Sequence, residues 1–181
     1  WMMPVILGGS IVKAIKNFKI EIDKEKVRRN LGYENGHGPS SSISSLIDEE
    51  IDEAYSFIQP SCFYQIMDIG RIRRPRVTLV NGTTISITSE VLSWVLYPCK
   101  KAVIFVASIG EGLEERTVQL MEEGHLLKAT LLDAIGSEAT EKVAYHLQER
   151  IQELANLDEA EITLRYSPGY CDWDITQQRV L

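Results

Sequence analysis

The chain has 181 residues, of which 44% are hydrophobic and 25% charged, so it is long enough to bury one sizeable core and shows no bias toward disorder. Its formal net charge of -7 opposes non-specific binding to phosphate backbones, so nucleic acid is not an expected partner. The three cysteines are widely spaced and include no C-x-x-C pair, which indicates neither a disulfide framework nor a cysteine zinc site and favours a cytoplasmic location.

The N-terminal part offers little that resembles a targeting signal. Residues 4–7 form a short apolar run with no basic region before it, which falls short of a secretory signal or a membrane span, so no membrane partner is expected. Residues 23–31 suit a short charged helix. The stretch GYENGHGPSSS, residues 32–42, gathers loop-forming residues. We therefore expect an N-terminal arm over residues 1–39 and a main domain over residues 40–181.

The first half of this main domain changes from a helical to a strand pattern. Apolar residues recur at helical spacing over residues 43–58, with acids on the other face, and predict an amphipathic helix. Residues 61–88 then read as strands. Within them RVTLV, Asn81-Gly82 and TTISIT predict a β-hairpin, because Asn-Gly suits a tight turn between antiparallel strands. The basic cluster of Arg71, Arg73, Arg74 and Arg76 fits a solvated face or strand edge.

The second half is mainly helical. Residues 89–97 suit a short helix, and KAVIFVAS at 101–108 predicts a central strand buried on both faces. Helical patterns then run from 113 to about 157, with an apolar stripe that places Glu141 on the opposite, polar face. A final strand is expected at Ile162–Leu164. The sum is an α+β domain with one mainly antiparallel sheet and long covering helices.

Two candidate sites carry a weak signal. Ser108-Ile109-Gly110-Glu111-Gly112 lies between a strand and a helix, as phosphate-binding loops do, but lacks the dinucleotide fingerprint and the Walker lysine. Glutamates follow it directly, so a glycine turn is the preferred interpretation and a nucleotide-binding enzyme the minor one. His37, His125 and His146 are isolated from one another, so no metal site and no catalytic constellation is predicted.

The stretch LRYSPGYCDWDITQQ, residues 164–178, is the most unusual in the chain. Ser167-Pro168-Gly169 must turn, because proline fixes one backbone angle and glycine permits a positive one. Arg165, Tyr166, Tyr170 and Trp173 around this turn could line a pocket for a flat, partly charged ligand. The alternative is a structural corner whose aromatic side chains cap the core, and the residues alone leave both interpretations open.

This stretch resembles the S-adenosylmethionine-binding motif of the activation domain of cobalamin-dependent methionine synthase, in which an arginine opens an R-x-x-P-G-Y segment. The similarity extends upstream over residues 104–151 and covers roughly 40–181. It implies that Arg165 grips the carboxylate of the ligand and that Tyr166, Ser167, Pro168, Gly169 and Tyr170 hold the rest. It also places Glu141 at the face that meets cobalamin, with Ser137 where the family has an aspartate.

The function implied by the resemblance is auxiliary. The chain would be a stand-alone activation domain that serves methionine biosynthesis by binding S-adenosylmethionine, and no catalytic side chain of its own is expected. One partner would be a methionine synthase, which is a methyltransferase that carries cobalamin, or a related corrinoid protein. The other would be a flavodoxin-like or ferredoxin-like electron donor. A ligand-sensing or scaffold module of the same fold, without a role in methyl transfer, is the alternative.

Three departures from related proteins bear on this expectation. The Asp-Trp segment that opens the domain in the full-length synthase has no counterpart in the arm. The family also continues past the motif into a closing segment, so residues 40–181 are expected to be truncated at the C-terminus. Corrinoid-carrying domains use an Asp-x-His-x-x-Gly stretch, and residues 35–39, NGHGP, lack both its aspartate and its glycine. Cobalamin is therefore expected on a partner and not on this chain.

Overall fold

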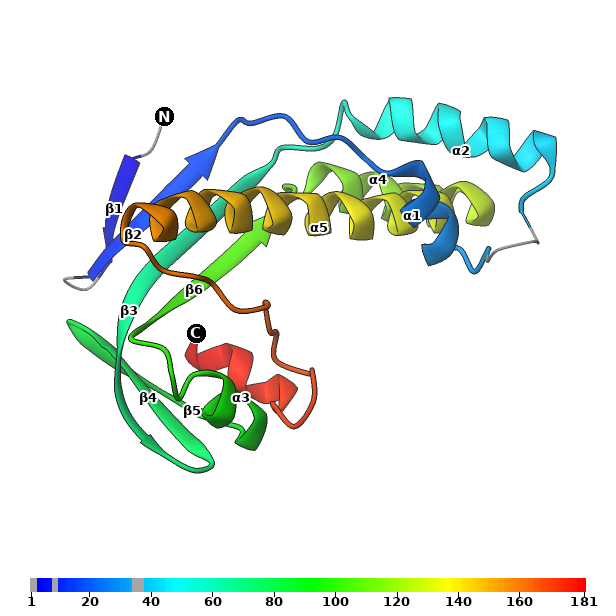
Figure 1. Ribbon diagram of the computed structural model, residues 1–181. Coiled ribbons are helices and arrows are strands. Elements are labelled where there is room, and N and C mark those ends of the chain that lie inside the picture. Colours follow the sequence, from blue (N-terminus) through cyan, green and yellow to red (C-terminus); the bar gives the residue numbers. More distant parts are fainter. Residues whose placement is uncertain (1–2, 8–9, 34–37) are drawn as a thin grey trace. The chain divides into compact units, whose positions relative to one another are not determined.

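The structure is a computed structural model that describes residues 3–7, 10–33 and 38–181. The chain divides into two compact units. The helical unit comprises Ile15–Cys62 and Ala107–Arg150, and the sheet unit comprises Phe63–Val106, Ile151–Leu181 and the described residues up to Ala14. Four elements each pass from one unit into the other along the chain: β2 (Ser10–Lys16), β3 (Ser61–Arg73), β6 (Lys101–Ser108) and α5 (Leu126–Leu157) (Figure 1). The loop expected at 32–42 falls partly on residues 34–37, which lie outside the described residues.

Runs of strands and runs of helices follow one another along the chain and give an α+β fold. The strands are β1 (Met3–Leu7), β2 (Ser10–Lys16), β3 (Ser61–Arg73), β4 (Arg76–Asn81), β5 (Thr83–Thr88) and β6 (Lys101–Ser108). The helices are α1 (Lys24–Asn30), α2 (Ser41–Ala54), α3 (Glu90–Val95), α4 (Gly112–Glu122), α5 (Leu126–Leu157) and the 3₁₀ helix η1 (Ile175–Val180). The helices predicted over 23–31, 43–58, 89–97 and 113–157 are therefore confirmed, with a break between α4 and α5.

The six strands form one sheet in the order β1-β2-β3-β4-β5, with β6 paired to β3. The pairs β1–β2, β3–β4 and β4–β5 are antiparallel. The predicted hairpin is β4–β5: Asn81 pairs with Thr83 across Gly82, whose φ of 68° is the positive value that glycine adopts without steric cost. The prediction of a mainly antiparallel sheet is thus confirmed.

Strand β3 bends along its length, and the sheet curls with it (Figure 1). Its pairing with β4 shifts register between Ile69 and Ile72, which is a β-bulge. Gly70 lies in this bulge, where an added Cβ would come within 3.1 Å of the Val80 side chain. Glycine at this position therefore lets β3 and β4 approach closely while β3 changes direction.

Strand β6 does not have the two buried faces that its apolar sequence predicted. None of its eight residues is fully buried, and Val106 is largely exposed. Within the described part of the chain, β6 pairs with β3 alone. A strand with a neighbour on one side keeps part of its surface accessible, so the prediction of a central strand was wrong.

The helical unit has a core of aliphatic side chains from α1, α2, α4 and α5. Helix α2 begins at Ser41, inside the stretch expected to be a loop, because the Ser40 side chain accepts the N–H of Ile43 and caps the helix. In α5 the predicted stripe is confirmed, since Ala139, Val143 and Leu147 are buried. Helix α1, in the expected N-terminal arm, contributes the fully buried Val27 to this core.

Two charged side chains of this unit are buried, and one of them is Glu50 in α2, which is 1% exposed. Its carboxylate lies 2.6 Å from Nζ of Lys128 at the start of α5. The hydrogen bond to Glu50 is the main reason that the pKa of Lys128 is raised. A buried carboxylate is costly unless an opposite charge compensates it, so this ion pair joins α2 to α5 at a position where both charges are needed.

The arginine cluster lies where β3 turns into β4. Arg71, Arg73, Arg74 and Arg76 are all exposed, as the interpretation as a solvated strand edge predicted. The guanidinium carbon of Arg74 lies 3.1 Å from the ring centroid of Trp94 in α3, which is a cation–π contact.

None of the described helices combines the length and the hydropathy that a membrane span requires.

The pair between Glu50 and Lys128 provides a test of the helical core. Lys128→Met keeps the side-chain length but leaves the buried carboxylate uncompensated, and we expect the free energy of unfolding to fall by about 2 kcal/mol, less than for a fully buried pair because Lys128 is partly exposed. Urea unfolding at neutral pH measures the change. Lys24→Met, which breaks the exposed pair with Asp48, is the control and should cost less than about 1 kcal/mol. Equal effects of the two variants would contradict a special role for Glu50.

Candidate functional site

The residues of the R-x-x-P-G-Y stretch lie on one loop of the sheet unit, between the end of α5 and the start of η1. Arg165, Tyr166 and Pro168 are half-buried, whereas Ser167, Gly169 and Tyr170 are exposed. The loop therefore presents an accessible tip over 167–171 between flanking residues that are more enclosed. Tyr170, which is 64% exposed, is the large aromatic side chain at this tip.

The turn in this loop is closed by backbone hydrogen bonds. The N–H of Gly169 donates to the carbonyl of Trp173 at 2.7 Å, and the N–H of Tyr170 donates to the carbonyl of Ser167 at 3.0 Å. Gly169 has a φ of 97°, and an added Cβ would meet Ile175 at 3.2 Å. The glycine predicted to turn the chain is thus required both for its backbone angle and for the close approach of Ile175.

The structure bears on one of the two interpretations of the aromatic side chains, the structural corner. Trp173 is 7% exposed and belongs to the core cluster of the sheet unit, and Tyr166 packs against the same cluster. These two rings cap the core, as the structural alternative predicted. Tyr170 is exposed instead, so it takes no part in this cap, and its role in a ligand site stays a prediction. The indole N–H of Trp173 has no hydrogen-bond partner among the described residues.

The strand predicted at Ile162–Leu164 is absent, and that prediction was wrong. Residues 160–167 are irregular in the structure, and Leu164 is 77% exposed. An alternation of apolar residues forms a strand only where a neighbouring strand offers paired N–H and C=O groups. The segment that leads to the loop therefore depends on contacts other than a strand ladder.

Side chains of the C-terminal segment provide those contacts. The carboxylate of Asp172 accepts hydrogen bonds from Oγ of Ser89 at 2.6 Å and from the backbone N–H groups of Glu90 at 2.5 Å and Val91 at 3.3 Å, at the start of α3. These hydrogen bonds lower the pKa of Asp172, and the bond from Ser89 has the largest effect. The sequence singled out the loop but not this anchor, because the paired residues are 81–83 positions apart.

A second anchor follows one turn later. The side-chain amide of Gln177 accepts the N–H of Thr88 at 2.7 Å and donates to the carbonyl of the same residue at 2.9 Å. This pair of bonds imitates the ladder that another strand would form with the end of β5. The candidate loop is thus followed by two polar anchors, one on α3 and one on β5.

Ser137 and Glu141, which the resemblance assigns to the partner face, lie in the helical unit on α5. Both side chains are exposed, and Tyr145, one turn further along the helix, is 52% exposed. The prediction that Glu141 points away from the local core is confirmed. The three residues form one accessible row at helical spacing.

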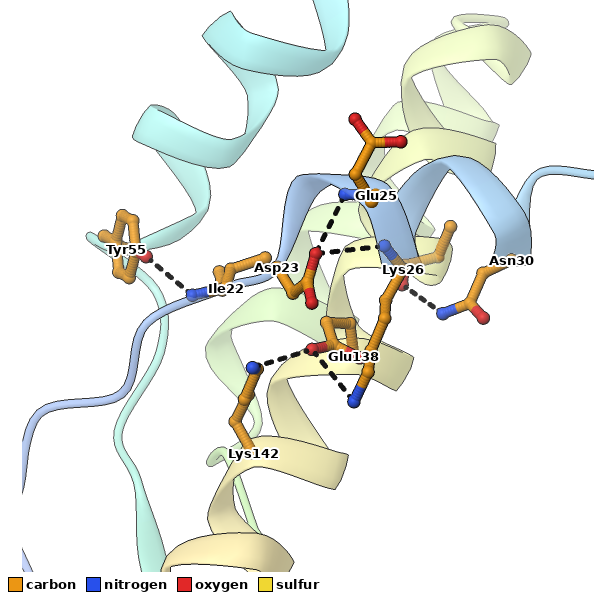
Figure 2. A network of polar contacts seen from close by, with 9 residues as sticks. Ile22, Asp23, Glu25, Lys26, Asn30, Tyr55, Glu138 and Lys142 are labelled. Carbon is orange, nitrogen blue, oxygen red and sulfur yellow. Dashed lines mark hydrogen bonds and ion pairs between the residues drawn. The ribbon is translucent and has the colours of Figure 1, made fainter. Parts of the chain in front are cut away.

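Glu138, next to Ser137, points the other way and was not expected from the sequence. It is 2% exposed, and its Oε1 lies 3.5 Å from Nζ of Lys142 and 4.0 Å from Nζ of Lys26 in α1 (Figure 2). The side-chain amide of Asn30 in α1 donates to the carbonyl of Ala134 in α5 in the same region. These contacts bind the inner face of α5 to α1.

The Gly110 turn has the structural role that was preferred for it. The carbonyl of Ile109 accepts the N–H of Gln59 at 2.7 Å. A Cβ at Gly110 would lie 3.2 Å from the Gln59 side chain, and one at Gly112 would lie 3.0 Å from the carbonyl of Phe57. The glycines therefore allow two chain segments to touch. The surface hollow beside this turn is lined mainly by glutamates, which would repel a phosphate: Glu111, Glu114, Glu115 and Glu122.

The described histidines and cysteines form no constellation. The ring of His146 stacks on Phe18 with centroids 4.2 Å apart, which accounts for it structurally. His37 and the stretch compared with corrinoid-carrying domains fall largely on residues 34–37, outside the described residues. Among the residues that the structure describes, no three His, Cys, Asp or Glu side chains gather as metal ligands would. Cys62, Cys99 and Cys171 are free thiols.

Comparison of the chain with models of known protein families and with curated proteins finds no match. The resemblance of the C-terminal stretch to an S-adenosylmethionine-binding motif therefore depends on the residues of this chain alone. Each unit carries one candidate feature. One is the anchored loop with the exposed Tyr170, and the other is the accessible row on α5 that includes Glu141.

The Asp172 anchor predicts a specific dependence of stability on pH. A carboxylate whose pKa is lowered by folding stabilises the protein above the pKa of an unfolded aspartate, about 3.9, and this contribution is lost as the pH falls through the lower folded value. We expect Asp172→Asn to be less stable than wild type above about pH 5, and the difference to shrink below about pH 4.

Urea unfolding of both proteins from about pH 7 to about pH 3 measures this difference. The pKa of Asp174 is also lowered, by its bonds to Thr176. Asp174 and the other acids are present in both proteins, so their contributions cancel in the difference between the two unfolding free energies. A difference that stays constant over the whole range would show that the charge of Asp172 contributes nothing.

Proposed function

We propose that the chain binds S-adenosylmethionine through the loop Arg165–Tyr170 and supports the reductive methylation of cobalamin carried by a methionine synthase or a related corrinoid protein. The observation that carries this proposal is the R-x-x-P-G-Y stretch, which forms a closed, anchored turn with its last tyrosine exposed. A ligand site of this kind requires a fixed backbone with accessible polar and aromatic groups, and both are features of the loop.

Each residue of the loop has a role that its chemistry suits. Arg165 is half-buried, and its planar guanidinium suits a carboxylate, which it can bind through two parallel hydrogen bonds. Tyr166, Ser167, Pro168 and Gly169 supply the backbone shape around the ligand. The exposed ring of Tyr170 can lie against the sulfonium group, whose positive charge is attracted to an aromatic face.

The chemistry itself belongs to the ligand and the partner. S-adenosylmethionine held by Arg165 and Tyr170 would supply the methyl group, a flavodoxin-like or ferredoxin-like donor would supply one electron to the partner's inactive cob(II) cobalamin, and S-adenosylhomocysteine would be released. This chain holds the methyl donor in position, so proximity and orientation account for most of its effect. No side-chain nucleophile is required, and the role is auxiliary to the methyltransferase.

The row on the outer face of α5 suits a partner surface. Ser137, Glu141 and Tyr145 are accessible, while the inner face of the helix is committed to the Glu138 contacts and the core. A carboxylate at such a face can accept a hydrogen bond from the partner and steer its approach. We assign this row to the docking of the cobalamin-bearing protein.

Calorimetric titration of the chain with S-adenosylmethionine, with ATP as a second ligand, tests the proposal directly. Binding of S-adenosylmethionine alone supports it. Binding of ATP alone would favour the nucleotide-binding interpretation of the Gly110 turn. If neither ligand binds, the chain is better described as a scaffold module of the same fold.

Arg165 should be needed for ligand affinity. Arg165→Ala is expected to weaken the binding of S-adenosylmethionine by roughly 1.5 to 3 kcal/mol, because a charge-assisted hydrogen bond to the ligand carboxylate is lost. Arg76→Ala, which removes an exposed arginine of the hairpin, is the matched control and should bind normally. A variant at Arg165 that binds normally but melts at a much lower temperature would make this arginine structural.

Tyr170 should contribute its ring and not its hydroxyl. Tyr170→Phe is expected to bind nearly as well as wild type, whereas Tyr170→Ala should lose roughly 0.5 to 2 kcal/mol of binding free energy, the range of a cation–π contact. Calorimetry with S-adenosylmethionine measures both. The same substitutions at Tyr97, another exposed tyrosine of the sheet unit, serve as controls. An equal loss in the two Tyr170 variants would assign the effect to the hydroxyl.

Glu141 should matter only when the partner is present. Glu141→Gln is expected to leave the melting temperature and S-adenosylmethionine binding unchanged and to slow the remethylation of cobalamin, measured spectroscopically with methionine synthase and a reductant. Glu149→Gln makes the same change at another exposed position of α5 and should have no effect. Wild-type rates in both variants would return Glu141 to the ordinary solvated surface.

A further inference from the structure

The exposed tip of the candidate loop is flanked on each side by an aromatic residue that packs in the core. Tyr166 packs against the core of the sheet unit on one side, and Trp173 is buried in the same core on the other. The residues between them, 167–172, are exposed apart from the half-buried Pro168. Their conformation therefore depends on how firmly the two ends are held and on the few bonds within the turn.

Besides the bond from the Tyr170 N–H to the Ser167 carbonyl, the turn has two backbone bonds that involve Trp173. The Gly169 N–H donates to the Trp173 carbonyl, and the Trp173 N–H donates to the Tyr170 carbonyl at 3.0 Å. Cys171, between them, has a φ of 53°, which is a strained value for a residue other than glycine. Such strain persists only where the surroundings fix the backbone, so a strong external contact is required next to Cys171.

Asp172 provides that contact. Its three hydrogen bonds, from Ser89, Glu90 and Val91, all come from one short segment at the start of α3. Two of the donors are backbone groups, which have little freedom to move, so the carboxylate is held from several directions. The side chain of Asp174, two residues later, accepts its hydrogen bonds from the N–H and Oγ1 of Thr176 in its own segment, so these bonds do not tie the loop to another element.

We propose that Asp172 is a positioning residue for the ligand site: it ties the loop to α3 and so fixes the backbone of Gly169 and the ring of Tyr170 before the ligand arrives. This inference rests on the proposed function. The physical reason is preorganisation, because a loop that is already ordered loses less conformational freedom when it binds. Asp172 itself does not touch the ligand in this arrangement.

The test compares S-adenosylmethionine binding by the full chain and by variants at the two aspartates. Asp172→Ala should bind about tenfold more weakly or worse, since every 1.4 kcal/mol of lost preorganisation corresponds to about a factor of ten. Asp172→Asn keeps the shape and an acceptor oxygen and should recover part of the affinity. Asp174→Ala, the matched control, should bind within about twofold of wild type. If Asp172→Ala does not fold, Asp172→Asn decides the question.

A double variant separates positioning from plain stabilisation. If Asp172 acts through Tyr170, the combination of Asp172→Ala with Tyr170→Ala should lose clearly less affinity than the two single losses multiplied. Hydrogen exchange gives a readout without ligand, because the amide protons of Gly169 and Tyr170 should exchange faster in Asp172→Ala and not in Asp174→Ala.

The outcomes distinguish a failure of the proposed function from a failure of the positioning role of Asp172. A wild-type chain that takes up no S-adenosylmethionine overturns the proposed function and this positioning role with it. A wild-type chain that binds, with an Asp172→Ala variant that binds equally well, overturns the positioning role alone. Weaker binding with losses that simply multiply, and with unchanged exchange at Gly169 and Tyr170, would also overturn it.

Discussion

The C-terminal segment of this protein is held in place by side-chain oxygens and amides instead of a strand ladder. Asp172 replaces the missing backbone partner at the start of α3, and Gln177 does the same at the end of β5. An irregular segment must find partners for its polar groups somewhere, and here two residues supply several of them. The burial of Trp173 and the closed turn at Gly169 follow from this attachment.

The helical unit buries two carboxylates between its helices. Glu50 and Glu138 are almost fully enclosed, and each is compensated by lysine: Lys128 for the first, and Lys26 with Lys142 for the second. Pairs of this kind contribute little net stability but penalise any packing that separates the charges. They fix which faces of α1 and α2 meet α5, and that choice leaves Glu141 on the accessible face.

Local patterns predicted the elements well, and distant contacts explain what they could not predict. Asn81-Gly82 between alternating residues identified the β4–β5 hairpin, and the stripe with Val143 identified α5, because both signals lie within one element. The strand at Ile162–Leu164 failed because its pattern says nothing about a pairing neighbour. Likewise, the burial of Glu138 was not predictable from its neighbours in the sequence, because one of its partners, Lys26, lies more than a hundred positions earlier. The loop of the candidate site was predictable from its proline and glycine, but its anchors were not.

The arginines at the turn between β3 and β4 have a consequence for how copies of this protein meet. From Ile69 to Ser89 the chain contains no acidic residue, so the hairpin carries charge of one sign next to β5, the last strand in the order of the sheet. One end of this strand is already covered, because Gln177 bonds both the N–H and the C=O of Thr88. Over the rest of the hairpin the exposed arginines Arg73, Arg74 and Arg76 give one charge sign to the surface, and like charges repel when the same surface of two copies approaches.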